Sequence, residues 1–412
     1  MRSDLLSIIR VLTSADTYIV DFQGMKFMRT LFILLVIYSF AFFNVSANAN
    51  DTFPAQPQML KVSSSLLTES ANFKVTLPAS YHSNTYKRYV VLVDLHPRSH
   101  GYLAGMEDWM SHNGGWPWLE TIIVTAPDGH AGLGELKSLA IKQQGNQQFL
   151  DFMEQDLLPA IDKQYRTNGF RILNGFTGYA TFSLYTLLNR PSLFNAYIAA
   201  SPVLDDNYAF VMADAAKKLA GMKGKPRFLF MSTSDSDFEQ NQLADFAKLE
   251  AIIKANATNL LDYRIKRFDG TYYMTQPILA TAYGIEAIFN DVHQVLKPDS
   301  AISRQGVAAI LAHYKTLSND KYGFDVPATD SLIALASSVE TTDPTKAIDI
   351  YQQTLKAIPT AFEASHALAS VYASQGQLVE AIKYEKQALE LTDHPFFQDK
   401  YSKQLAEYQA KH

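Results

Sequence analysis

Apolar residues along the first three quarters of the chain form short continuous runs that alternate with stretches of helical spacing. Residues 90–95 (Val-Val-Leu-Val-Asp-Leu) and 121–125 (Thr-Ile-Ile-Val-Thr) are apolar runs, a pattern typical of parallel strands covered on both faces. Between residues 149 and 161, apolar side chains instead recur on one helix face. Because strands that alternate with helices need crossover connections, the pattern predicts an α/β fold, a sandwich with a mostly parallel sheet, over residues 60–297.

The same pattern places the remaining elements of this segment. Further strands are predicted at 72–77, 170–173, 196–200, 227–232 and 263–268, and further helices at 181–188, 238–255 and 276–295.

Beyond residue 297 the pattern becomes helical only. Ala347 and Ala381, and likewise Leu355 and Leu389, are separated by 34 residues, the period of the tetratricopeptide repeat. We therefore expect a helical connection over 298–327 and a small all-α domain of repeats over 328–411. Two interpretations stay open, because the repeats could bind a protein partner in a groove or could only support the α/β domain.

The first 49 residues have the pattern of an export signal. A charged segment beginning at Met25 is followed by an apolar run from 31 to 43 and by small residues, which predicts a signal peptide over 25–49 with cleavage after Ala47 or Ala49. Residues 1–24 are interpreted as a spurious extension ahead of the true start. We expect a periplasmic or secreted protein without a membrane span in the mature chain.

Composition limits the partners. The 412 residues carry a net charge of −5, with acidic and basic residues scattered along the chain, so no basic stripe for nucleic acid is expected. The chain has no cysteine, which excludes disulfides and acylation on cysteine. We expect no cofactor and no resident metal.

The most informative stretch joins a buried strand to a helix through Gly175-Phe176-Thr177-Gly178-Tyr179. The nucleophile elbow of an α/β-hydrolase has this layout and is usually spelled G-x-S-x-G. Here the first glycine is kept as Gly175, the nucleophile position holds Thr177, and the second glycine position holds Tyr179.

With these flanks, the chain resembles the putative-esterase family of α/β-hydrolases, which includes enterochelin and other siderophore esterases. The stretches that carry the resemblance are 73–81, 149–167, 171–173 and 190–202. The resemblance implies hydrolysis of a carboxylic ester by a Ser-Asp-His triad with backbone donors as the oxyanion hole, and a small ester or siderophore-like ligand.

Carried onto this chain, the triad positions are degenerate. The nucleophile becomes Thr177, and the acid becomes Asp235 or Asp237, which could equally be solvated turn residues. The base position falls on Tyr272 or Tyr273. A phenol, with a reference pKa of about 10, accepts a proton poorly at neutral pH, whereas imidazole is suited to that task.

The rim of the expected pocket is altered as well. The resemblance places the oxyanion hole at Gly178 and in the loop that follows residue 95, which reads His96-Pro97-Arg98-Ser99-His100. Pro97 has no amide hydrogen to donate. His96 and His100 could form a new polar site, but a metal would need a third ligand.

Three hypotheses follow. The first is a pseudo-hydrolase that acts by binding a ligand or a protein. The second is an active ester hydrolase that uses Thr177 or an unrecognised nucleophile, with His96 or His100 reaching in as the base. The third is new chemistry built on these two histidines.

Overall fold

The computed structural model describes residues 56–112 and 118–412. The expected signal peptide over 25–49 and the extension over 1–24 lie outside the described residues. Within the described residues, no helix is long and apolar enough to cross a membrane.

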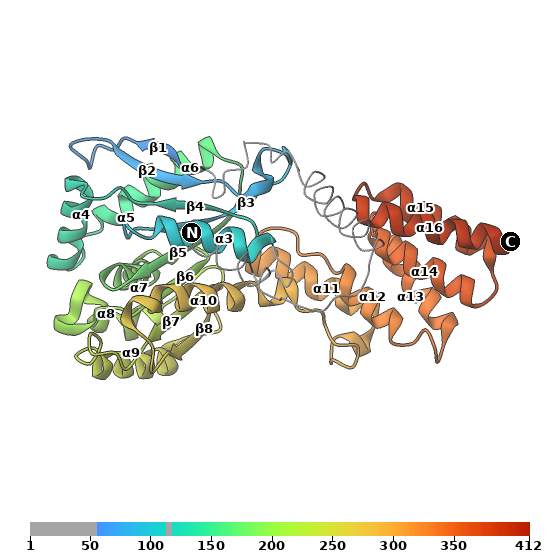
Figure 1. Ribbon diagram of the computed structural model, residues 1–412. Helices are drawn as coiled ribbons and strands as arrows, with labels where there is room; N and C mark the ends of the chain where they lie inside the picture. Colours follow the sequence, from blue (N-terminus) through green and yellow to red (C-terminus); the bar gives the residue numbers. More distant parts are fainter. Residues whose placement is uncertain (1–55, 113–117) are drawn as a thin grey trace, which may run out of the picture. The chain divides into compact units, whose positions relative to one another are not determined.

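An eight-stranded sheet organises the α/β part, in the order β1-β2-β4-β3-β5-β6-β7-β8. β1 and β2 pair antiparallel with their neighbours, whereas β4, β3, β5, β6, β7 and β8 are all parallel. The mostly parallel sheet is therefore confirmed (Figure 1). The strands are β1 Gln58–Val62, β2 Ala71–Thr76, β3 Tyr89–Asp94, β4 Thr121–Thr125, β5 Thr167–Phe176, β6 Ala196–Ala200, β7 Arg227–Thr233 and β8 Leu261–Arg267.

Helices cover both faces of this sheet because the central strands are apolar on both faces. On one face, Val91, Val93 and Leu173 pack against α4 to α9, and on the other face Val90 and Leu92 pack against α3 and α10. These helices are α3 His100–His112, α4 Ala131–Lys142, α5 Gln148–Phe152, α6 Leu158–Gln164, α7 Gly178–Asn189, α8 Val211–Ala220, α9 Leu243–Asn256 and α10 Gln276–His293. The continuous apolar strands thus reflect a sheet buried between two layers.

The predicted helix over 238–255 begins later than expected, at Leu243. Glu239 is buried and accepts hydrogen bonds from the hydroxyls of Thr233, Ser234 and Ser236. These side-chain contacts hold residues 234–242 in turns and delay the helix.

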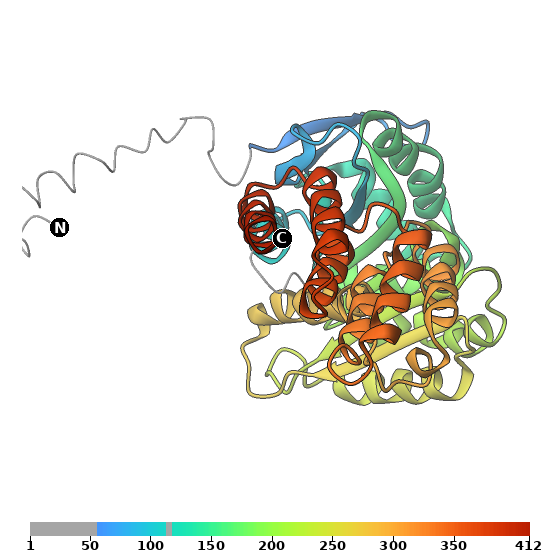
Figure 2. The ribbon, with the colours of Figure 1, turned by 90° about the vertical axis from the view of Figure 1, so that its right-hand side faces the viewer.

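The last part of the chain is helical, as expected. Its elements are α11 Val307–Thr316, α12 Thr329–Ser337, α13 Pro344–Ala357, α14 Phe362–Ser374, α15 Leu378–Leu391 and α16 Pro395–Lys411. α13 and α15 begin 34 positions apart, at Pro344 and Leu378. From α12 to α16 each helix contacts the next one along the chain, and these are the orange to red helices of Figure 2.

Aromatic side chains join this helical region to the sheet. Tyr322 is 1 % exposed, and its ring contacts Phe170 at the start of β5 and Phe289 in α10, at centroid distances of 5.7 and 6.2 Å. Its hydroxyl donates to the Ile288 carbonyl at 2.7 Å. One apolar cluster therefore runs from the sheet face under α10 into α11 to α16.

Candidate active site

A strained turn joins β5 to α7 at Thr177. Thr177 has φ 58° and ψ −127°, a conformation that a β-branched residue rarely adopts. Its amide donates to the Ala200 carbonyl of β6 at 3.1 Å, and its carbonyl accepts from the Thr181 amide at 3.2 Å. The chain therefore keeps the backbone of an elbow that presents a side chain at the carboxyl end of the sheet.

Gly175 makes this turn possible. A Cβ atom at residue 175 would overlap the carbonyl of Tyr179 in the first turn of α7. The second glycine position is less restricted, since Tyr179 is only half-buried there and its ring contacts the His96 ring at 5.5 Å. Only the first of the two glycines is therefore required by close packing.

The loop after β8 places two tyrosines at the expected base position. Tyr272 is 88 % exposed, whereas the Tyr273 ring packs against Phe176, the neighbour of Thr177, at 4.9 Å, and against Phe238 at 5.2 Å. Burial raises the pKa of Tyr273 to about 12. Tyr273 is thus the phenol beside the elbow, and it stays protonated at neutral pH.

Three carboxylates lie after β7. Asp235 and Asp237 are both exposed, and Asp235 accepts a hydrogen bond from the Gly270 amide at 2.7 Å. Glu239 is 2 % exposed, and its charge helps to raise the pKa of Tyr273. Glu239 was not predicted from the sequence, although a glutamate among serines and threonines is a signal for a buried, hydroxyl-bound carboxylate. The roles of Asp235 and Asp237 stay predictions.

The loop after β3 uses its own backbone donors. The His96 amide donates to Asp94 at 2.7 Å, the Arg98 amide donates to His96 Nδ1 at 3.2 Å, and the Ser99 amide donates to the His96 carbonyl. Pro97 has no amide hydrogen. None of the amides from 96 to 99 therefore points freely at a developing oxyanion. Gly178, the first residue of α7, remains as a donor at the helix start.

The two histidines that follow β3, His96 in the loop and His100 at the start of α3, have different surroundings. His96 flanks the elbow, with its ring 6.4 Å from the Phe176 ring, and burial lowers its pKa. His100 contacts the hydroxyls of Thr76 and Thr125 through its two ring nitrogens, each at 2.9 Å. His100 is therefore occupied within the fold. Among the described residues, no group of three metal-ligating side chains was found.

The Thr177 hydroxyl has no hydrogen bond to an imidazole among the described residues: the ring contacts of His96 and His100 are with the Arg98 amide and with Thr76 and Thr125. Two buried hydroxyls nearby, Ser201 and Ser232, have no hydrogen-bond partner in this part of the chain, and Ser201 adopts a strained φ of 50°. The site therefore keeps strain and polar groups at the carboxyl ends of β5, β6 and β7, without an assembled triad.

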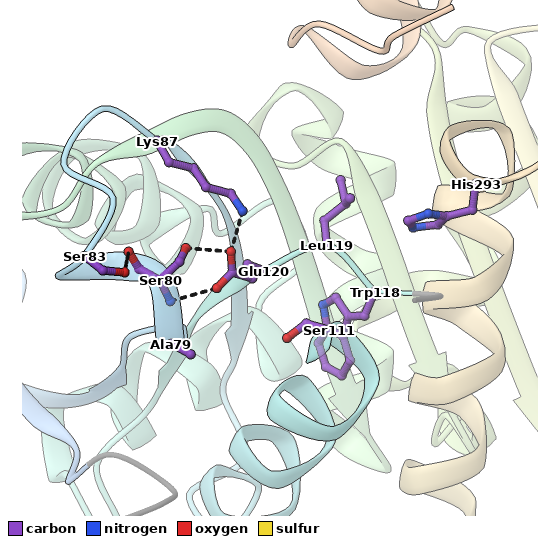
Figure 3. Close-up of a pocket in the computed structure, with 9 residues that line it drawn as sticks. All are labelled: Ala79, Ser80, Ser83, Lys87, Ser111, Trp118, Leu119, Glu120 and His293. Carbon is purple, nitrogen blue, oxygen red and sulfur yellow. Dashed lines mark hydrogen bonds and ion pairs between the residues drawn. The ribbon is translucent and has the colours of Figure 1, made fainter. Parts of the chain in front are cut away.

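Two cavities were candidates for the ligand site. A larger one, of about 650 Å³, lies at the amino ends of β3 and β4, where Glu120 accepts from Ser80 and pairs with Lys87 (Figure 3). The elbow follows the carboxyl end of β5, so this cavity lies at the opposite ends of the strands from the elbow. A smaller cavity of about 190 Å³ lies beside the elbow and is lined by Tyr179 and Lys137. We take the smaller cavity as the candidate site.

Comparisons with known proteins agree with this architecture. Residues 63–263 match the model of the family described as Putative esterase. An uncharacterised protein from Capnocytophaga ochracea is similar in structure, with a TM-score of 0.63 at 15 % identity over 86 % of this chain and 100 % of that one. An IroE-like serine hydrolase from Shewanella oneidensis has a TM-score of 0.54 at 20 % identity, over 73 % of this chain and 99 % of that one. No curated protein matches.

Proposed function

We propose that this chain is an esterase-like α/β-hydrolase-fold protein that binds a small ligand beside its elbow and does not hydrolyse esters. The observation that carries the proposal is that Thr177 stands at the elbow and Tyr273 packs on its neighbour Phe176, at the two positions where a triad would have serine and histidine. A phenol with a pKa of about 12 cannot take the proton of a hydroxyl at neutral pH. The loss of free amides from the loop after β3 removes oxyanion donors as well.

Ester hydrolysis by the purified protein tests this proposal. We expect p-nitrophenyl acetate and butyrate to be turned over at background rates, equally by the wild-type protein and by Thr177→Ala. We also expect no labelling by a fluorophosphonate probe, since removing triad members costs orders of magnitude in rate. Turnover that Thr177→Ala abolishes would contradict the proposal.

An active ester hydrolase is the second candidate, because the His96 ring lies against Phe176, which precedes Thr177, and against Tyr179, two residues after it. In that case His96 would rotate to accept the Thr177 proton, and the ligand would be a small ester, as in a siderophore-like compound. His96→Gln would then abolish the same turnover that Thr177→Ala abolishes. Equal background rates in all three proteins decide against this candidate.

Two further parts of the proposal rest on the sequence. The charged, apolar and small residues of 25–49 support export to the periplasm or beyond, and N-terminal sequencing of exported protein should begin near Asn48 or Asn50. The 34-residue spacing of α13 and α15 supports a tetratricopeptide-like arrangement. A protein partner for these helices is part of the proposal, and its alternative is a supporting role within the fold.

A further inference from the structure

The cavity beside the elbow has apolar walls and a basic group. The loops after β3 and β4, together with α4 and the first turn of α7, enclose about 190 Å³. Leu95, Leu133, Phe149 and the Tyr179 ring form the walls, and Lys137 of α4 lines the same space. A body of apolar atoms would therefore be shielded from water here, next to a cationic group.

Lys137 has no acidic partner among the described residues. Its Nζ lies 3.7 Å from the centroid of the Tyr179 ring, and burial, without an opposing carboxylate, lowers its pKa. A buried ammonium is costly unless it is paired, because it has lost part of its hydration. The cation–π contact offsets only part of that cost.

Other hydrogen-bond donors lie close to Lys137 Nζ. A Cβ atom at Gly178 would lie 3.1 Å from the Tyr208 hydroxyl and 3.8 Å from Lys137 Nζ, so both groups lie over the first residue of α7. The twelve-residue helix α7 directs its free amides and the positive end of its dipole to this end. An anion placed there would meet an ammonium, a hydroxyl and a helix start.

His130 adds an unsatisfied nitrogen to the lining of the cavity. Its Nδ1 accepts a hydrogen bond from the Leu133 amide at 3.2 Å, so a neutral ring carries its proton on Nε2. That Nε2 is buried and has no hydrogen-bond partner in the described part of the chain. Of the described lining residues, Asp128 alone carries a carboxylate, and it is exposed at the rim.

We propose that this cavity binds the carboxylate of a small organic acid, with Lys137 Nζ and the start of α7 holding the charge and the apolar walls holding the body. A single ammonium and a small apolar volume fit a monoanion better than a phosphate, which carries more charge than one lysine balances. The inference rests on the proposed function, since it names the ligand class of the same non-hydrolytic site.

Calorimetric titration of the chain without residues 1–49 tests the proposal, with benzoate as the probe. Its neutral isostere benzamide, the cation benzylamine and inorganic phosphate are the comparison ligands. Lys137→Met removes the charge and keeps the length of the side chain, Lys137→Arg keeps the charge, and Lys142→Met is the matched control, because Lys142 is exposed at the end of the same helix. Tyr208→Phe removes only the hydroxyl.

We expect the wild-type protein and Lys142→Met to bind benzoate and to bind the other three ligands much more weakly. Lys137→Met should weaken benzoate binding by roughly ten- to a hundredfold, since charge-assisted hydrogen bonds are about twice as strong as neutral ones. Lys137→Arg should retain most of the affinity, and Tyr208→Phe should lose severalfold. If Lys137→Met does not fold, Tyr208→Phe and the benzamide comparison decide the question.

Equal binding of benzoate and benzamide, tighter binding of phosphate, or no binding of benzoate would overturn the proposal. Its failure is distinguishable from failure of the proposed function. If the protein neither binds benzoate nor turns over esters, only the proposed carboxylate site is ruled out. Ester turnover that depends on Thr177 removes the proposed function, even where benzoate still binds in a Lys137-dependent manner.

Discussion

At the scale of single residues, the site has Thr177 and Tyr273 at the two positions where the triad implied by the resemblance has serine and histidine. Thr177 keeps the strained geometry of the elbow, at a conformational cost of about 1–3 kcal/mol. Tyr273 fills the space beside it with a ring that packs on Phe176. The retained strain argues that the cavity beside the turn is still in use, since strained residues persist mainly at functional sites.

The geometry predicts which substitutions would raise ester hydrolysis. Thr177→Ser combined with Tyr273→His should raise p-nitrophenyl acetate turnover by roughly ten- to a hundredfold over Thr177→Ser alone, because the new imidazole would lie beside the elbow and near Glu239. The matched variant, Thr177→Ser with Tyr272→His, should gain little, because Tyr272 is exposed. Adding Glu239→Gln should remove the gain. A larger gain from Tyr272→His would contradict this assignment.

The sequence predicted an elbow at Thr177 and a tyrosine at the position where the resemblance implies histidine, because both predictions depend on short contiguous motifs. The sequence could not show which of Tyr272 and Tyr273 lies beside the elbow, because that depends on how the loop packs. In the structure Tyr272 is exposed and Tyr273 packs on Phe176. Glu239 and Lys137 were not predicted from the sequence. Glu239 was signalled only by the serines and threonines around it and becomes notable through its burial. Lys137 is brought beside the elbow by the fold rather than by sequence proximity.

At the scale of elements, the loop after β3 is held by a buried carboxyl group. Asp94, at the end of β3, accepts from the His96 amide at 2.7 Å and from Asn174 Nδ2 at 2.6 Å, while Thr281 of α10 donates to Asn174 Oδ1. Burial raises the pKa of Asp94 to about 7. The protonation of one side chain is thus linked to the loop that borders the candidate site.

This pKa gives the stability a definite pH dependence. At a pH between 3.8, the ordinary pKa of aspartate, and about 7, the raised pKa of Asp94, this side chain holds a proton in the folded chain and releases it on unfolding. Its contribution to the free energy of unfolding is therefore complete below pH 3.8 and falls as pH rises, by on the order of a few kcal/mol.

Asp94→Asn should flatten the fall in stability measured by urea titrations across this range. Asp237→Asn, at an exposed carboxylate, should leave the slope unchanged. An equal slope in wild type and Asp94→Asn would contradict the linkage.

The elements were predictable to different degrees. The buried strands β3 to β7 followed from their apolar runs, because burial on both faces leaves a strong signal. Strand β1 was missed, since only Leu60 and Val62 of its five residues are buried. Helices α3, α4 and α8 were missed as well. α4 carries two glycines near its start, which weaken the helical pattern.

At the scale of the whole molecule, the question is whether the terminal helices support the α/β part or act independently. The contacts favour support, because Tyr322 closes the apolar surface of Phe170 and Phe289 and donates to the Ile288 carbonyl. A second link is the ion pair between Lys321 and Asp291 of α10. The period of the repeats could be read from the sequence, but this contact could not, since it depends on aromatic residues far apart in the chain.

Substitution at Tyr322 separates the two roles. Tyr322→Ala should destabilise the whole described fold by about 3–5 kcal/mol, the usual cost of removing a buried aromatic ring, while Tyr322→Phe should cost only about 1 kcal/mol for the lost hydrogen bond. A chain that ends at Lys297 should remain folded at a clearly lower melting temperature, because its sheet strands all precede that point. Tyr384→Ala is the matched control, since that ring stacks on Tyr372 within the terminal helices, at 5.6 Å. If Tyr322→Ala and the shortened chain both melt at the wild-type temperature, the α/β part does not need these helices, and a role in binding a partner becomes the better explanation for their presence.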